Sequence, residues 1–298
     1  MHRIGELAAI GTSVSWTIGA LVMERSVRSV GVMAVNTLKV AFGGLYLTLL
    51  ALWLNGALFP AAVPPDAWLY IGVSAFLGFV IGDYFLFHAY ALVGSRLAML
   101  LMSVSVPLTA IAAYLVFGEA LGGMALAGMA LCVTGIALTV MSGKNNKTDE
   151  HTDGGRYFKG VVFGLLSGLS MAASTLCTKK GAVGIDAVSA TQIRIFCACA
   201  GFMLFAMLTG KTGEIRSAIV DRRALALIAI GGVFGPFVGV GLLLFAIQNA
   251  EAGVVSTLSS FSPVLIIPAS MILFRRKVSI GEIAGALIAV AGIALIFL

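Results

Sequence analysis

Residues 128–138 read GMALCVTGIAL, and residues 285–295, near the end of the chain, read GALIAVAGIAL. The two stretches share their glycine spacing and the ending GIAL. Upstream, residue i of the first half matches residue i+155 of the second half over the first two apolar runs, and the offset later slips by one or two. The chain therefore contains an internal repeat. Matched pairs include Gly5/Gly160, Ser15/Ser170, Leu21/Leu176, Arg25/Lys180, Lys39/Arg194, Pro107/Pro263 and Phe117/Phe274.

The composition indicates a membrane protein. Of the 298 residues, 60% are hydrophobic and only 11% are charged, whereas a soluble domain carries about 25% charged residues. The mean hydropathy is +1.06. Such a chain has too few polar atoms to cover the outside of a soluble protein, which excludes a soluble enzyme, a disordered protein and a nucleic-acid binder.

Ten apolar runs are long enough to cross a bilayer, which takes about 20 apolar residues in a helix. We expect an all-α membrane protein with a five-helix repeat at 1–143, a cytoplasmic linker at 144–158 and a second five-helix repeat at 159–298. Because five is odd, the second repeat enters the membrane inverted, as in many secondary transporters. The ten predicted transmembrane helices are about 5–23, 33–54, 68–90, 96–117, 122–141, 159–178, 187–209, 223–248, 253–274 and 279–298.

Basic residues are divided unevenly between the two sides of this predicted bundle. Of the 19 Lys and Arg residues, 14 fall on the side of the 144–158 linker and three on the side of the N-terminus. The positive-inside rule places the richer side in the cytoplasm. We therefore expect a multi-pass protein of the cytoplasmic (inner) membrane with both termini outside.

Several of these features together resemble the EamA family of the drug/metabolite transporter superfamily. They are the inverted repeat, Val14-Ser15-Trp16 in the first span, a basic residue in the second span of each half, and the two helix endings quoted above. The resemblance covers nearly the whole chain. It implies a secondary transporter, and we suspect the amino-acid exporter branch of the family.

Two features depart from the family pattern. The family usually has a Gly-Glu-Arg-like turn after the fourth span of each half, where this chain has Gly118-Glu119-Ala120 and Arg275-Arg276-Lys277. Family members also carry basic residues between spans two and three, which places their N-terminus inside, but residues 55–67 contain no Lys or Arg. The count of basic residues thus predicts the opposite of the family's usual orientation.

Ionisable residues inside a span are costly and are candidates for function. Lys39 lies about 9 Å and Asp83 about 10 Å from the cytoplasmic end of their predicted helices. The matched depths predict an ion pair, which keeps both groups charged and could gate the cytoplasmic side. The alternative is that Lys39 snorkels to the interface and Asp83 packs structurally.

Arg194 enters from the outer side to a depth of about 12 Å. The repeat position of Asp83 is about Gly239, so the second half offers no matching acid. Arg194 could therefore bind a substrate carboxylate with two parallel hydrogen bonds. Carbonyls of broken helices, or Glu119, could satisfy it instead.

Two further groups of residues complete the predicted site. Pro107 and Pro263 interrupt the fourth span of each half and could act as hinges or as static kinks. Large, adaptable side chains could line a cavity for apolar groups, and an amide one turn before Lys39 could add a polar contact. These residues could equally be core or lipid-facing; they are Trp16, Met171, Tyr84, Met102 and Asn36.

The predicted function is export of small zwitterionic metabolites by alternating access, with an amino acid carrying an aromatic or other apolar side chain as substrate. A proton-coupled antiporter of drugs or other metabolites is the alternative, with Asp83 carrying the proton. An intramembrane aspartyl protease would need a second Asp beside Gly82-Asp83, and a channel would need rings of like residues; neither pattern is present in the sequence.

We expect no enzymatic activity and no cofactor. We also expect no metal centre, because His2, His88 and His151 are too scattered to form one. The expected partners are the lipid bilayer and the small-molecule substrate, and no nucleic acid. Glycines four residues apart, such as Gly231 and Gly235, indicate close helix packing. We expect this packing to lie within one chain, so that the protein is a monomer.

Overall fold

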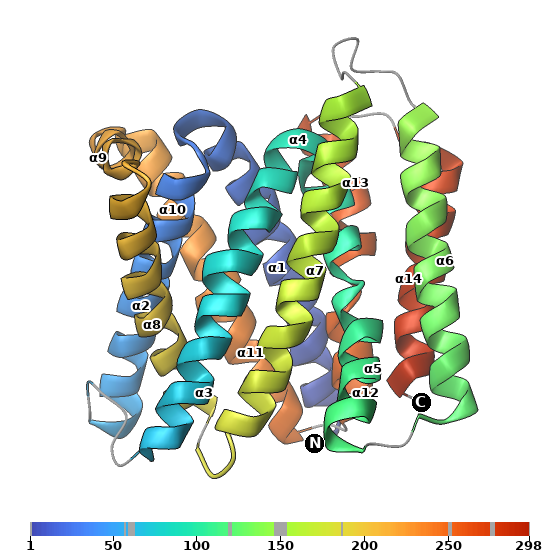
Figure 1. The fold of residues 1–298 in the computed structure, drawn as a ribbon, viewed down its shortest axis with the longest axis horizontal. Helices are drawn as coiled ribbons and strands as arrows, with labels where there is room; N and C mark the ends of the chain where they lie inside the picture. The colour runs from blue at the N-terminus through green and yellow to red at the C-terminus, as the bar shows by residue number, and fades with distance from the viewer. Residues whose placement is uncertain are drawn as a thin grey trace.

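The computed structural model describes residues 2–56, 58, 63–118, 121–145, 154–185, 187–249, 252–274 and 278–297, and the elements assigned in these ranges are helices (Figure 1). The predictions that involve Glu119, His151 and residues 275–277 lie outside the described residues. The first half forms α1 (His2–Val30), α2 (Val32–Asn55), α3 (Pro65–Ala75), the π-helix η1 (Phe76–Asp83), α4 (Tyr84–Met102), α5 (Ser105–Phe117) and α6 (Gly123–Asn145).

The second half repeats this order with two differences: a short helix, α9, is added, and two helices, α11 and α12, stand in place of α4. It forms α7 (Gly154–Gly181), α8 (Ala187–Leu208), α9 (Thr212–Val220), α10 (Arg222–Gly232), the π-helix η2 (Val233–Phe237), α11 (Val238–Asn249), α12 (Ala252–Ser259), α13 (Ser262–Phe274) and α14 (Ile280–Phe297). Helix α6 extends to Asn145 and α7 begins at Gly154, so the ends of the predicted 144–158 linker are helical. Its residues 146–153 lie outside the described part of the chain.

Equivalent helices of the two halves run in opposite directions. Helix α1 starts at the lower edge in Figure 1, where both chain ends lie, and α7 starts at the upper edge. We call the lower edge the terminal edge. The upper edge, where α6 ends and α7 begins, is the linker edge. The inverted relationship expected from the sequence is therefore present in the fold.

By length and composition, seven helical stretches among the described residues can cross a membrane. One of them, Pro65–Phe117, is 53 residues long and contains a sharp break at Gly94, whose φ of 83° and ψ of 161° are non-helical. Ser262–Phe274 and Ile280–Ile296 are shorter apolar helices. The structure thus supports a multi-pass membrane protein, while the number of ten crossings stays a prediction.

The two halves interlock at the π-helices. Ser15 on α1 donates a hydrogen bond to the carbonyl of Phe234 in η2 (2.6 Å), and Ser170 on α7 donates to the carbonyl of Leu77 in η1 (2.6 Å). Ser15 and Ser170 are repeat mates. Each half therefore uses the same serine of its first helix to satisfy a carbonyl in the π-helix of the other half, and π-helices of this kind are frequent at functional sites.

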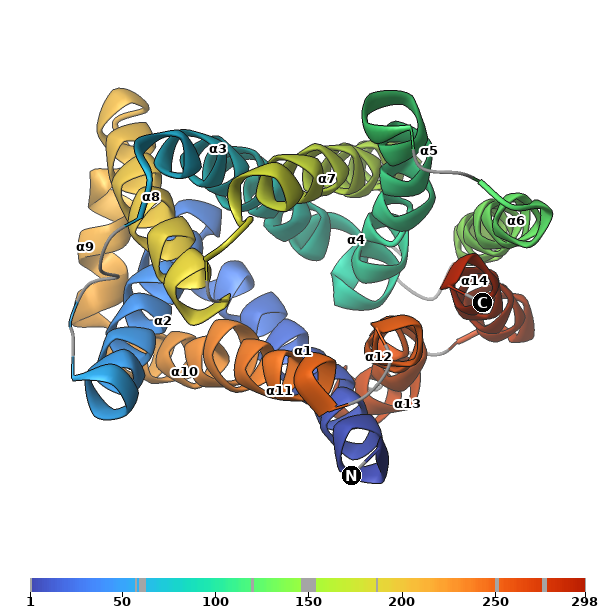
Figure 2. The same cartoon turned by 90° about the horizontal axis from the view of Figure 1, so that it is seen from below.

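The two stretches quoted first pack against each other as α6 and α14, which stand together at one end of the molecule (Figure 2). A Cβ atom added to Gly128 would meet the carbonyl of Gly292, and one added to Gly135 would meet the backbone around Gly285 and Ala289. Glycines let two antiparallel backbones approach closely in this way. The repeated glycine spacing is therefore explained by this contact.

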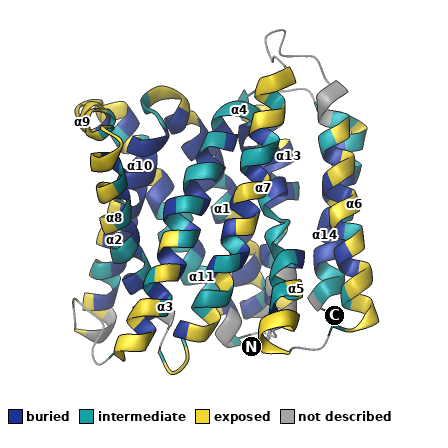
Figure 3. Cartoon of the chain, in the orientation of Figure 1, coloured by how far each residue is buried: buried dark blue, intermediate teal, exposed yellow. Residues whose placement is uncertain are grey.

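Exposed residues lie along the outside of the bundle (Figure 3), and many of them are large and apolar. Trp53 is 81% exposed and Ile280 is 85% exposed, which is tolerable on a surface that faces lipid. The largest cluster of buried apolar side chains joins the linker-edge parts of α1, α2, α4 and α8, and includes Met33, Phe87 and Phe202. The linker edge therefore holds the largest cluster of the buried apolar core.

Candidate functional site

An ion pair between Lys39 and Asp83 lies in the interior of the bundle. Lys39 stands seven residues into α2, and Asp83 is the last residue of η1. The Nζ of Lys39 donates to Oδ2 of Asp83 at 2.5 Å, and each side chain is 9% exposed. The pair expected from the matched depths is therefore present. In a low-dielectric interior, such a pair keeps both groups charged where either alone would be costly.

Two aromatic rings lie beside the Lys39 ammonium group. Its Nζ lies 4.5 Å from the ring centre of Phe87 and 5.9 Å from that of Phe79. A ring face attracts a cation through its quadrupole, and the attraction is stronger where water is excluded. The ammonium group is therefore held by one carboxylate and one near ring, and these contacts fix it beside Asp83.

Arg194, the repeat mate of Lys39, approaches the same place from α8. Its Nη2 donates to Oγ of Ser174 at 3.3 Å, a long hydrogen bond, and its guanidinium carbon lies 5.2 Å from the ring centre of Phe79. The Ser174 hydroxyl in turn donates to the carbonyl of Ser74 at 2.8 Å. The Nε of Arg194 is buried and has no hydrogen-bond partner among the described residues.

A glycine makes room for this arrangement. A Cβ atom added to Gly78 in η1 would lie 2.5 Å from the Ser174 hydroxyl and 3.3 Å from Nη2 of Arg194. Gly78 therefore lets the guanidinium group reach the Ser174 hydroxyl. We define the candidate site as Lys39, Asp83, Phe79, Arg194 and Ser174.

Sequence reasoning missed a buried carboxylate at the end of α1. Glu24 is 0% exposed; its Oε2 accepts from the amide (2.8 Å) and hydroxyl (2.6 Å) of Ser95, and its Oε1 lies 3.0 Å from Nη2 of Arg28. The predicted first span ends at residue 23 because Glu24 is charged, whereas α1 continues to Val30. Its i,i+4 spacing to Arg28 was the available signal.

A second missed carboxylate comes from the other half. Glu282 on α14 is 2% exposed, and its Oε2 lies 2.8 Å from Nη2 of Arg96. Together, Glu24 and Glu282 hold the two residues that follow Gly94, at the break between the two parts of α4. This turn at the linker edge is therefore anchored to both halves of the protein.

Of the predicted polar and aromatic residues, two have clear surroundings. Asn36 on α2 is 0% exposed, and neither atom of its amide has a hydrogen-bond partner among the described residues. Tyr84 follows Asp83 and packs edge-on against His88 (4.5 Å between ring centres) and Phe205 (5.2 Å). Tyr84 thus belongs to an aromatic cluster between α4 and α8, and it is the next residue in the chain after Asp83 of the ion pair.

The remaining predicted lining residues come from separate helices. Trp16 is half-buried on α1, where a Cβ added to Gly239 of α11 would meet its indole Nε1. Met171 on α7 and Met102 at the end of α4 are half-buried, and Met102 packs at the margin of the main core cluster. Their contact with substrate stays a prediction.

The two predicted hinge prolines stand next to helix breaks. Pro107 is the third residue of α5, after a break at Ser103 and Val104, and Pro263 is the second residue of α13. Proline is well tolerated in a first helical turn, where its missing N–H needs no partner. The fourth span of each half is therefore divided into two helices at matched positions, and a hinge role for the prolines stays a prediction.

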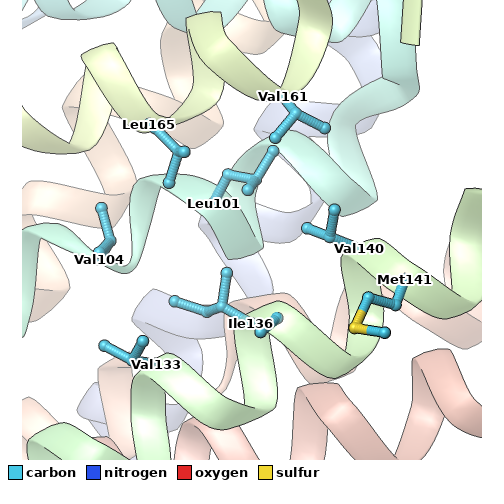
Figure 4. Close-up of a pocket in the computed structure, with 9 residues that line it drawn as sticks. Leu101, Val104, Val133, Ile136, Val140, Met141, Val161 and Leu165 are labelled. Carbon is cyan, nitrogen blue, oxygen red and sulfur yellow. The ribbon is translucent and has the colours of Figure 1, made fainter. Parts of the chain in front are cut away.

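An apolar groove of about 310 Å³ lies between α4, α6 and α7 (Figure 4), and no residue of the candidate site lines it. Apolar side chains line it throughout, so it offers no group to bind a charged metabolite. Among the described residues, no cluster of three or more His, Cys, Asp or Glu side chains could hold a metal ion. The lining residues are Leu101, Val104, Val133, Ile136, Ala137, Val140, Met141, Val161 and Leu165.

The fold and site define a multi-pass membrane protein built from two inverted repeats around buried charges. Residues 3–141 and 158–298 each match the model of the EamA-like transporter family, and the chain belongs to that family. A solved structure described as "Crystal structure of protein" has a similar fold, with a TM-score of 0.65 and 14% identity over 99% of this chain and 96% of that chain. At that identity the likeness shows the fold alone. No curated protein matches the chain.

Proposed function

We propose that the protein is a secondary transporter that exports small carboxylate-bearing metabolites by alternating access, with apolar amino acids as the first candidates. The observation that carries this proposal is Arg194, a basic group on a membrane-spanning helix, with a buried Nε that lacks a hydrogen-bond partner among the described residues. A guanidinium group binds a carboxylate with two parallel hydrogen bonds. The ring of Phe79 beside the guanidinium group suits an apolar substrate group.

The helix arrangement supports ten crossings. The 53-residue stretch Pro65–Phe117 would be about 80 Å long as one helix, far beyond the roughly 30 Å of a bilayer core. The break at Gly94 divides it into two crossings of suitable length. Counting α10 to α11, α12 to α13 and α14 as one crossing each then gives five per half. An even total agrees with both termini lying at one edge (Figure 1).

Alternating access needs a gate on each side of the site, and the linker edge offers one. The main apolar cluster lies there, and the turn after Gly94 is anchored by Glu24 and Glu282. The pair of Lys39 and Asp83 lies between this edge and Arg194. We propose that the ion pair closes the path from the linker edge, and that Arg194 is reached from the terminal edge.

For orientation, we propose that the linker edge faces the cytoplasm and that both termini lie outside. Basic residues are concentrated at this edge, including Arg222 and Arg223 at the start of α10, as the positive-inside rule requires. A single cysteine at position 149, in the linker, should be inert to an impermeant thiol reagent in intact cells and react after the cells are opened. Labelling from outside would reverse the orientation.

The experiment that tests the function is counterflow in proteoliposomes. Vesicles loaded with one unlabelled apolar amino acid should accumulate the same labelled amino acid transiently and with saturation, whereas a channel would show neither. Imposing a pH gradient separates the alternative, a proton-coupled antiporter of drugs or other metabolites in which Asp83 carries the proton. Exchange that is unchanged by the gradient favours uncoupled export.

A further inference from the structure

One basic side chain of the candidate site, the half-buried Arg194 with its buried Nε, has no carboxylate partner among the described residues. The buried carboxylates each have a basic partner within 3.0 Å, which leaves Arg194 as the basic side chain of the candidate site with no carboxylate within 4.0 Å in that part of the chain. The three pairs are Glu24 with Arg28, Asp83 with Lys39, and Glu282 with Arg96.

Within the candidate site, Lys39 and Arg194 contribute two positive charges and Asp83 contributes one negative charge. A net positive charge in a low-dielectric interior is costly unless an anion compensates it. A bound monocarboxylate would neutralise the site, whereas a zwitterion, which carries no net charge, would leave the excess positive charge in place.

The contacts of Asp83 also favour a monocarboxylate over a zwitterion. An amino acid bound by its carboxylate at Arg194 would need a carboxylate for its ammonium group. The only carboxylate of the candidate site is Asp83, and it already holds Lys39 at 2.5 Å. The Lys39 ammonium group also lies against the ring of Phe87. The ammonium group of a substrate would therefore have to displace the Lys39 ammonium group from Asp83.

We propose that the site recognises a carboxylate and does not require an α-ammonium group, so that small apolar monocarboxylates are substrates and amino acids are one case among them. This inference rests on the proposed function, because it concerns the substrate of the same site. It makes Lys39 a specificity-determining residue. By occupying Asp83, Lys39 removes the acceptor that would otherwise favour an ammonium-bearing substrate.

The test compares ligands that differ by one charged group. Proteoliposomes are loaded with the amino acid that the wild-type protein exchanges best, for example L-phenylalanine, and exchanged against L-phenylalanine, 3-phenylpropanoate or phenethylamine. The matched set for L-leucine is L-leucine, 4-methylpentanoate and 3-methylbutylamine. Protein-free liposomes at pH 8 correct for passive entry of the protonated acids.

We expect the monocarboxylate to exchange at least as well as the amino acid, and the amine not to exchange. A monocarboxylate that exchanges tenfold more slowly than the amino acid would overturn the inference while leaving the transporter function intact. Exchange of the amine would also overturn it, because a cation would then be bound. If no compound of a full amino-acid panel exchanges, the proposed function itself has failed.

Two variants test the role of Lys39. Lys39→Met frees Asp83 to accept an ammonium group, and the preference for the amino acid over the monocarboxylate should rise at least tenfold. The matched control is Lys39→Met with Asp83→Asn, which removes both charges and should restore exchange of the monocarboxylate at least as fast as that of the amino acid. This double variant also covers the case in which the single variant does not fold. A preference for the amino acid in the double variant would contradict the inference.

Discussion

Lys39 and Arg194 occupy equivalent positions of the two inverted halves, and they approach the same ring, that of Phe79, at 5.9 and 5.2 Å. One enters from α2 near the linker edge and the other from α8 nearer the terminal edge. The symmetry stops there, because Asp83 pairs with Lys39 and its repeat position in the second half is apolar. We propose that this asymmetry gives the site one side that is neutralised by Asp83 and one side that binds an anion.

The ion pair predicts a coupled effect on stability. Lys39→Met or Asp83→Asn alone leaves a buried charge unpaired, and we expect each to destabilise the protein by about 3–5 kcal/mol. Combining the two removes both charges and should recover most of that loss. Thermal unfolding in detergent, followed by tryptophan fluorescence, measures this. Additive losses in the double variant would show that the pair is not coupled.

Gly78 in η1 and Gly235 in η2 are glycines of the two π-helices, and they form a test pair for the placement of Arg194. Gly78→Ala places a methyl group against Ser174 and Arg194, and we expect at least a tenfold loss of counterflow because the guanidinium group must move. Gly235→Ala has no atom within 4 Å of the added carbon and should retain wild-type exchange. Equal effects of the two substitutions would contradict the placement of Arg194.

The seam between α6 and α14 should be sensitive to size. Gly135→Ala puts a carbon into the backbone of α14 around Gly285 and Ala289, and we expect a loss of about 1–3 kcal/mol from overpacking. Gly123→Ala, at the start of the same helix with no atom within 4 Å, is the control and should change stability little. Thermal unfolding in detergent compares them, and similar midpoints for both variants would refute the close contact.

The anchor of the turn after Gly94 gives a fourth prediction. Glu24→Ala leaves the buried amide of Ser95 without its acceptor and removes the partner of Arg28, which should cost about 1–3 kcal/mol of stability. Glu24→Gln keeps an acceptor for Ser95 and should be milder. The comparison uses unfolding in detergent, and a Gln variant as unstable as the Ala variant would argue that charge alone matters.

Much of the fold could be predicted from the sequence because membrane insertion imposes simple rules. Apolar runs of about 20 residues marked the spans, and the match of residues 128–138 with 285–295 revealed the repeat. Helix bounds were less predictable, since cutting at charged residues ended the first span before Glu24. The π-helices could not be foreseen, because their register depends on serines of the opposite half, Ser15 and Ser170.

The residues of the site that could be predicted are those whose depth along a helix shows which charges lie at the same level in the membrane. The matched depths of Lys39 and Asp83 predict their ion pair. Arg194, the repeat mate of Lys39, is a candidate because the second half has no acid at the position that matches Asp83. Phe79 and Ser174 were missed, because a phenyl ring and a hydroxyl in an apolar run carry no signal until two helices bring them beside a cation. Glu282 was missed for the same reason, since its partner Arg96 lies in the other half.

We propose that Arg194 binds the carboxylate of a transported substrate, and counterflow with Arg194→Ala tests this claim. Purified wild-type protein, Arg194→Ala and Arg194→Lys are reconstituted at equal density, after their thermal unfolding in detergent shows that each is folded. We predict saturable counterflow for the wild type, at least a tenfold loss for Arg194→Ala, and partial activity for Arg194→Lys, which keeps the charge without the two parallel bonds. A folded Arg194→Ala variant that exchanges substrate at the wild-type rate would contradict the claim.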